Sequence, residues 1–180
     1  PLPNLRARPG TEARHRLAMT RLAAADNPRL AVDDRELARE GVSYTVDTLA
    51  EVCAEVGTQK PIWLILGADA FLRLPAWSRW LQLFDLAHIA VATRPGYALD
   101  EAVNRSAELA AEWNRRNVTV PVPPLCAGVP AGAITRLPIP LLEISATDLR
   151  ARMSRGASVR YLLPRAVVDY IAAHRLYPMQ

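Results

Sequence analysis

The sequence predicts an α/β fold in which helices flank a mainly parallel sheet. Residues 61–66 form an uninterrupted apolar run with the pattern of a parallel strand covered on both faces, and residues 88–93 are the next predicted strand. Segments with helical periodicity separate such runs, and this alternation is typical of α/β proteins. The 180 residues are 51% hydrophobic, which suffices for one well-buried core. We therefore expect a single domain spanning residues 1–180.

Apolar residues at helical spacing predict the helices of this fold. Gly57 and Gly156 mark the clearest helix ends, and Pro164 stands at the start of the last helix. The predicted helices span residues 11–26, 43–56, 100–117 and 145–155, and two more begin near residues 74 and 164. Shorter strand candidates are residues 30–32, 118–120 and 133–136.

The stretch around Ser145 predicts a helix start that can bind an anion. Ser145 has the position of an N-cap, and Asp148 falls where its carboxylate can reach back to the Ser145 amide, as in a capping box. Unpaired N–H groups at a helix start suit a phosphate. Thr147 and Arg150 lie three residues apart and add a hydroxyl and a guanidinium. The alternative is an ordinary capped helix with a solvated arginine.

A second candidate position follows the apolar run 61–66. There Gly67 and Asp69 occupy the carboxyl end of the expected strand, where ligands bind in open α/β sheets. A carboxylate at this place can bind ribose hydroxyls. The alternative is that Asp69 only caps the helix that follows.

Two further segments carry candidate binding groups. Ser43, Tyr44 and Thr45 give the helix 43–56 a start rich in hydroxyl groups, which again suits an anion. Trp77 follows Pro75 in the first turn of the helix predicted from residue 74, while Trp80 already serves the apolar side of that helix. The Trp77 ring can therefore face a cleft or the interior.

Composition and motifs exclude several classes of function. The 22 basic and 18 acidic residues give a net charge of +4, and the arginines are scattered, so the sequence does not favour nucleic-acid binding. Two cysteines and three isolated histidines form no metal or disulfide pattern. We find no Walker P-loop, G-x-S-x-G elbow or G-x-G-x-x-G turn. No apolar run approaches the length of about 20 residues that spans a membrane, so we expect a cytoplasmic protein.

Six motifs in order give the chain a resemblance to a known family. They are Ser43-Tyr44-Thr45-Val46-Asp47-Thr48-Leu49, Gly67-Ala68-Asp69, Leu74-Pro75-Ala76-Trp77, Arg94-Pro95-Gly96-Tyr97, Ile144-Ser145-Ala146-Thr147-Asp148-Leu149-Arg150, and Leu162-Leu163-Pro164 leading to Tyr170-Ile171 and Leu176-Tyr177. The chain resembles bacterial nicotinate mononucleotide adenylyltransferase over almost its whole length. The resemblance implies a Rossmann-like nucleotidyltransferase fold. It also implies transfer of an adenylyl group from ATP to nicotinate mononucleotide, giving deamido-NAD and pyrophosphate in NAD biosynthesis.

The resemblance also assigns roles to the candidate residues. Ser145, Thr147 and Arg150 look like the group that holds the ATP phosphates, and Gly67 and Asp69 look like nucleotide-binding residues. Thr45, Trp77 and the backbone of Ser78 resemble the nicotinate pocket, in which the ring stacks on an indole. Mg²⁺ is implied as the ion that neutralises the triphosphate oxygens.

One departure from the family concerns its N-terminal strand and loop, which carry a Gly-rich turn and an H-x-G-H sequence. These have no counterpart in the 180 residues, so the catalytic histidines of the family cannot be assigned here. In the family this loop stabilises charge that develops on the α-phosphate. We expect that a strand, loop and helix of roughly 30 to 50 residues belong to the complete protein.

Two other functions fit the same residues. The first is another adenylyltransferase of the superfamily, such as one that acts on phosphopantetheine, although pantetheine offers no aromatic acid for Thr45 and Trp77. The second is a nucleotide-binding module without catalysis, which a phosphate site without a catalytic histidine would also explain.

Overall fold

The computed structural model describes residues 11–93, 96–118, 129–140, 142 and 144–177, and these form two compact units. The sheet unit consists of residues 41–141, and the helical unit combines residues 1–40 with residues 142–180. The prediction of a single domain stays a prediction, since two compact units can belong to one domain. Among the described residues, every helix is too short or too polar to cross a lipid bilayer.

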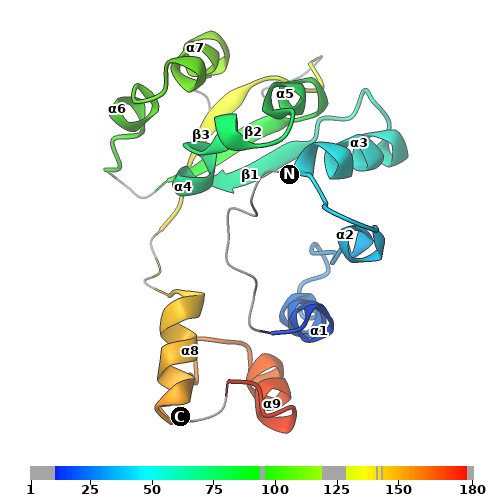
Figure 1. Ribbon diagram of the computed structural model, residues 1–180, viewed down its shortest axis with the longest axis vertical. Coiled ribbons are helices and arrows are strands. Elements are labelled where there is room, and N and C mark those ends of the chain that lie inside the picture. Colours follow the sequence, from blue (N-terminus) through cyan, green and yellow to red (C-terminus); the bar gives the residue numbers. More distant parts are fainter. Residues whose placement is uncertain (1–10, 94–95, 119–128, 141, 143, 178–180) are drawn as a thin grey trace. The chain divides into compact units, whose positions relative to one another are not determined.

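A three-stranded parallel sheet forms the centre of the sheet unit (Figure 1). Its order is β1 (Trp63–Gly67), β2 (His88–Thr93) and β3 (Ile134–Pro138). Gly67 pairs with Ala92, and Thr93 pairs with Pro138, so the carboxyl ends of all three strands lie at one edge. This result confirms the predicted α/β fold with a parallel sheet.

The central strand is covered more completely than its neighbour. Five of the six residues of β2 are buried, as its apolar run predicts, whereas Ile65 of β1 exposes 62% of its surface. The prediction that both faces of residues 61–66 are covered is therefore wrong at Ile65. β1 is an edge strand of the described sheet, with β2 as its one neighbour there.

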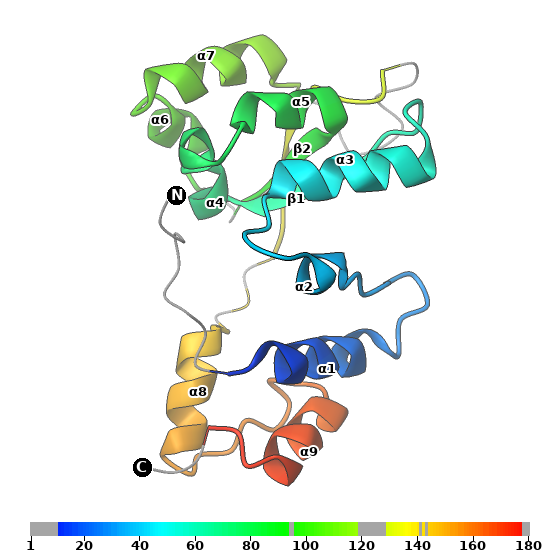
Figure 2. The ribbon, with the colours of Figure 1, turned by 45° about the vertical axis from the view of Figure 1, so that its right-hand side comes forward.

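In the described part of the sheet unit, five helices and two 3-10 turns surround this sheet (Figures 1 and 2). They are α3 (Thr45–Val56), α4 (Ala68–Phe71), η1 (Leu74–Ala76), η2 (Trp80–Gln82), α5 (Leu83–Leu86), α6 (Leu99–Val103) and α7 (Ala107–Arg116). With the strands they bury one apolar core. Its members include Val46, Leu49, Leu66, Phe71, Leu74, Phe84, Ile89, Val91, Leu99, Val103, Leu109, Trp113 and Ile134.

Two predicted helices of the sheet unit are interrupted. The helix expected over residues 100–117 stops at Val103 and restarts at Ala107, because Ser106 acts as a new N-cap and accepts a hydrogen bond from the Leu109 N–H at 3.4 Å. The helix expected from residue 74 becomes η1, η2 and α5. Arg79 has a left-handed backbone between the two 3-10 turns, and this breaks the helical path.

The helical unit contains α1 (Ala13–Ala24), α2 (Arg35–Ala38), α8 (Ala146–Ser154) and α9 (Arg165–Ala173). α1 packs against α9, where the Thr11 hydroxyl donates to the Tyr177 hydroxyl at 2.8 Å. The strand expected over residues 30–32 is wrong, because this segment is irregular and Leu30 is exposed. Of the strand candidate 118–120, only Val118 is described; its N–H donates to the Ile134 carbonyl at 2.9 Å.

Candidate functional site

The first turn of α8 forms as the sequence predicts. The Ser145 hydroxyl oxygen accepts a hydrogen bond from the Asp148 N–H at 3.0 Å, which makes Ser145 the N-cap. Arg150 Nη2 lies 3.4 Å from the Thr147 hydroxyl oxygen and donates to it, so both groups lie on one side of the helix. Ser145, Thr147 and Arg150 are all exposed. The predicted anion-binding groups of this helix are therefore together and accessible to a ligand.

Asp148 differs from its predicted role in the capping box. Its carboxylate accepts a hydrogen bond from Arg152 Nε at 2.8 Å, one turn further along α8, rather than from the Ser145 amide. An unpaired carboxylate in the first turn would repel a phosphate. The ion pair with Arg152 reduces this repulsion and leaves the Arg150 guanidinium available for a ligand.

The end of α8 is fixed by a Schellman motif. Gly156 has φ +70°, its N–H donates to the Met153 carbonyl at 3.0 Å, and the Ala157 N–H donates to the Arg152 carbonyl at 2.9 Å. This confirms the predicted helix end at Gly156. With both ends defined by hydrogen bonds, α8 presents its first turn in a fixed conformation.

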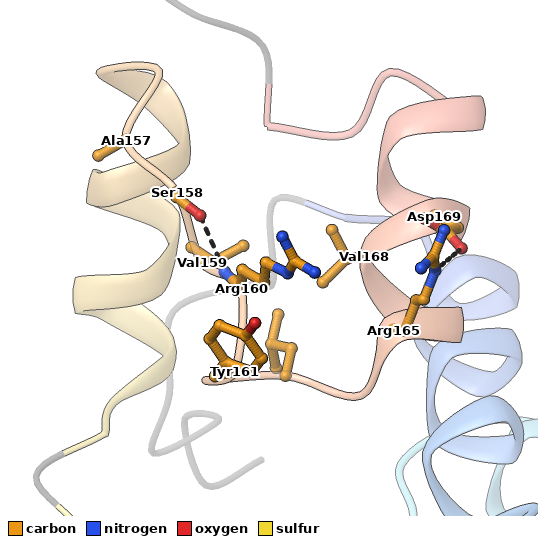
Figure 3. Close-up of a pocket in the computed structure, with 9 residues that line it drawn as sticks. Ala157, Ser158, Val159, Arg160, Tyr161, Arg165, Val168 and Asp169 are labelled. Carbon is orange, nitrogen blue, oxygen red and sulfur yellow. Dashed lines mark hydrogen bonds and ion pairs between the residues drawn. The ribbon is translucent and has the colours of Figure 1, made fainter.

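The described residues of the helical unit border at least two hollows. A mostly apolar one of about 370 Å³ lies between α1, α8 and α9 and is bordered by Leu149 and Arg150. A wider one of about 590 Å³, shown in Figure 3, follows α8 and is lined by Arg160, Tyr161 and Arg165. In that view the Arg160 side chain extends toward α9. Its guanidinium lies 5.0 Å from the centre of the Tyr161 ring.

In the sheet unit, Gly67 and Asp69 lie where β1 gives way to α4. Gly67 is the last residue of β1 and has the N-cap position of α4, and Asp69 lies in the first turn of that helix. No side-chain hydrogen bond caps α4, so Asp69 does not act as a cap. Its carboxylate is exposed and has no hydrogen-bond or ion-pair partner among the described residues.

Thr45, Trp77 and Ser78 are all half-buried in the sheet unit. Thr45 is the first residue of α3, whose N-cap is Tyr44. The prediction that Trp77 lies in the first turn of a helix is wrong. Trp77 instead follows η1 in an extended conformation with φ −82° and ψ 147°. Its ring packs against the edge of the apolar core. Trp77 is thus neither fully buried nor fully exposed.

Sequence reasoning missed one contact beside these three residues. Arg79 Nη2 donates to Oδ1 of Asp47 at 2.7 Å and to Oδ2 at 2.8 Å. The two residues are 32 positions apart, so no local pattern relates them. The available signal was that Asp47 lies within one motif of the resemblance and that Arg79 closely follows another.

Within the described residues, no cluster of three or more His, Cys, Asp or Glu side chains could hold a metal ion. His88 is fully buried inside the sheet unit, which agrees with a structural role.

Comparisons with known proteins identify the family of this chain. The family model described as cytidylyltransferase-like matches residues 2–152. A probable nicotinate-nucleotide adenylyltransferase of Halorhodospira halophila is 49% identical over 168 residues, which are 92% of this chain and 73% of that protein. A probable nicotinate-nucleotide adenylyltransferase of Laribacter hongkongensis is 44% identical over 97% of this chain and 76% of its own.

Solved structures support the fold. Plasmodium falciparum nicotinic acid mononucleotide adenylyltransferase, complexed with APC, has a TM-score of 0.62 and 17% identity over 93% of this chain and 76% of its own. The same enzyme complexed with NaAD has a TM-score of 0.61. From the matched family model and the identity to its relatives, we conclude that this chain belongs to the nicotinate-nucleotide adenylyltransferase family of nucleotidyltransferases.

Proposed function

We propose that the protein transfers the adenylyl group of ATP to nicotinate mononucleotide, giving deamido-NAD and pyrophosphate in NAD biosynthesis. The observation that carries the proposal is the start of α8, where Thr147 and Arg150 lie 3.4 Å apart beside the Ser145 cap. The names of the relatives favour this acceptor over phosphopantetheine. Because ATP is a cytoplasmic metabolite, we place the reaction in the cytoplasm.

The reaction is an in-line displacement at the α-phosphate of ATP. A phosphate oxygen of nicotinate mononucleotide forms a bond to the α-phosphorus as the bond to the β-phosphate bridging oxygen breaks, and pyrophosphate leaves with the bonding pair. Such a reaction needs positioning and charge stabilisation more than covalent chemistry. In this proposal the α8 N–H groups, Thr147 and Arg150 bind the β- and γ-phosphates and stabilise the leaving group.

Magnesium enters this proposal as part of the substrate, MgATP. A magnesium ion bound to ATP takes most of its ligands from phosphate oxygens and water, so it does not need an all-protein cage. The ion neutralises triphosphate charge, while Arg150 supplies the protein's own positive charge.

The acceptor requires groups for an aromatic ring and for a carboxylate. We assign the ring to the half-buried face of Trp77, on which it stacks. The Thr45 hydroxyl and the Ser78 N–H donate hydrogen bonds to the nicotinate carboxylate. Asp69, which has no described partner, and the Gly67 backbone bind ATP, and the Asp69 carboxylate accepts hydrogen bonds from ribose hydroxyls.

Titration calorimetry and product analysis test this function. With the protein expressed from its complete reading frame, we expect deamido-NAD to form from MgATP and nicotinate mononucleotide, as measured by liquid chromatography. Phosphopantetheine in place of the mononucleotide should give no adenylylated product. Adenylylation of phosphopantetheine alone would reject the proposal, and ATP binding without turnover of any acceptor would favour a non-catalytic module.

A further inference from the structure

The Asp47–Arg79 ion pair joins two segments of the sheet unit that carry different parts of the proposed acceptor pocket. Asp47 lies in the first turn of α3, two residues after Thr45. Arg79 directly follows Trp77 and Ser78. One guanidinium nitrogen contacts both carboxylate oxygens, at 2.7 and 2.8 Å. This contact thus links the segment that carries Thr45 to the segment that carries Trp77 and Ser78.

The backbone at Arg79 needs such a contact. Its φ of 52° and ψ of 37° place it in the left-handed region, which is unfavourable for a residue with a Cβ atom. The Arg79 carbonyl then accepts a hydrogen bond from the Gln82 N–H at 2.9 Å, which begins η2. A residue held in this conformation fixes the direction of the Trp77–Ser78 segment that precedes it. The ion pair stabilises that conformation.

The charge of the pair has a second consequence. A lone Asp47 carboxylate near the start of α3 would disfavour an anionic ligand there. Arg79 neutralises it, while the side chains of Arg79 and Asp47 remain 45% and 36% exposed. The first turn of α3 can then offer the Thr45 hydroxyl to a carboxylate without net repulsion from Asp47.

We propose that Asp47 and Arg79 act as positioning residues for the mononucleotide. The inference rests on the proposed function, because it takes Thr45, Trp77 and Ser78 as the groups that bind the nicotinate ring and its carboxylate. The ion pair holds the Trp77–Ser78 segment in a fixed position relative to the first turn of α3. Neither residue of the pair touches the reacting atoms.

Steady-state kinetics of four variants test the role of the pair. Asp47→Asn removes the charge. Arg79→Gly removes the guanidinium but suits the left-handed backbone, so it separates the ion pair from backbone strain. We expect each to raise the KM for the mononucleotide roughly threefold to tenfold, with the KM for ATP and kcat changed little. The reversed pair, Asp47→Arg with Arg79→Asp, should bring the KM for the mononucleotide most of the way back to its original value. Arg79→Lys should raise this KM less than Arg79→Gly does.

The control variant is Arg115→Ala, which removes the ion pair between an exposed arginine and Glu112 on α7 and leaves the Glu112–Arg116 ion pair in place. It should leave both KM values unchanged. Trp77→Ala, measured alongside, separates this inference from the proposed function. If Trp77→Ala raises the mononucleotide KM but Asp47→Asn and Arg79→Gly do not, the positioning role is rejected and the pocket stands. If none of the three raises it, the pocket itself is rejected.

Two other outcomes would also overturn the positioning role. A loss confined to the Arg79 variants, with Asp47→Asn harmless, would mean that Arg79 touches the substrate directly. A parallel rise of the KM for both substrates, together with a lower melting temperature, would mean that the pair only stabilises the fold.

Discussion

The backbone N–H of Ala133 donates a hydrogen bond to Nδ1 of His88 at 3.1 Å. On the other side of the ring, Nε2 lies 3.0 Å from the Val129 carbonyl oxygen, to which it can donate. This pair of contacts fits the neutral ring with its proton on Nε2. Burial lowers the pKa of His88 below its usual value of 6.5, since the charged form would lose its hydration. The imidazole thus links β2 to the segment that leads into β3.

The first prediction concerns this histidine and the pH dependence of stability. Because the folded-state pKa is lowered, the unfolded chain binds more protons below about pH 6.5, and the stabilisation is lost as the pH falls from there. We expect His88→Gln to lower the free energy of unfolding by about 1 to 3 kcal/mol at pH 8. Urea unfolding between pH 5 and 8 should show a shallower pH dependence for the variant. An equally steep pH dependence in the two proteins would contradict the prediction. His15 and His174 are present in both proteins, so they cannot cause a difference between them.

The second prediction concerns acid stability and Asp100. Its carboxylate accepts hydrogen bonds from the Arg136 guanidinium and from Trp113 Nε1, the latter at 3.1 Å. Arg136 holds the pKa of Asp100 below its usual value of 3.8. The corresponding stability is present above that value and is lost as the pH falls through the lower folded-state pKa. Asp100→Asn should therefore flatten the acid branch of the stability curve below about pH 4. If the stability of the variant falls as steeply below about pH 4 as that of the unmodified protein, Asp100 does not contribute to the acid dependence.

Parts of the fold that follow from local chemistry could be predicted from the sequence. The strand β2 could be predicted from the length and the apolar composition of its segment alone. The ends of α3 and α8 followed from Gly57 and Gly156, both of which have positive φ values, and the start of α8 followed from Ser145. In each case the residues that determine the structure are neighbours in the chain.

The features that escaped prediction depend on contacts between distant residues or on competing local preferences. Ser106 lies within a helical pattern, and only the structure shows that it restarts the helix as a cap. The left-handed backbone of Arg79 is unusual for arginine, and its partner Asp47 is far away in the sequence. The apolar spacing of Trp77 and Trp80 therefore suggested a continuous helix that the backbone does not form.

The third prediction tests the phosphate site on α8. Arg150→Ala should weaken ATP binding by about 1.5 to 3 kcal/mol, because a charge-assisted contact to phosphate is lost, and should affect the mononucleotide less. Arg155→Ala is the matched control, since Arg155 is exposed at the opposite end of the same helix. Calorimetric titration of both ligands measures the effect. Equal losses for the two ligands, or none for ATP, would remove Arg150 from the phosphate site.

The fourth prediction concerns the stability of the turn at Tyr161. This residue is 87% exposed and has φ +68°, a conformation that penalises β-branched side chains most. We expect Tyr161→Val to lower the free energy of unfolding by about 1 to 2 kcal/mol. Tyr161→Gly should change it by less than about 1 kcal/mol, because glycine accepts this backbone but gains freedom when unfolded. Chemical denaturation measures both free energies of unfolding. A similar decrease in the two variants would show that the tyrosine ring itself contributes the stability.

The last prediction distinguishes the two roles open to Trp77. Its half-buried ring packs on the edge of the core, so Trp77→Ala should cost less than the roughly 3 to 5 kcal/mol of a fully buried tryptophan. Loss of ring stacking and contact area should weaken mononucleotide binding about ten- to a hundredfold and leave ATP binding nearly unchanged. Trp80→Ala is the control, because the Trp80 ring lies edge-on to Phe84 with centroids 6.0 Å apart and packs against the same core. It should lower the melting temperature without a selective effect on either ligand. If Trp77→Ala instead behaves like Trp80→Ala, with both affinities falling in parallel, Trp77 belongs to the core and the nicotinate ring binds elsewhere.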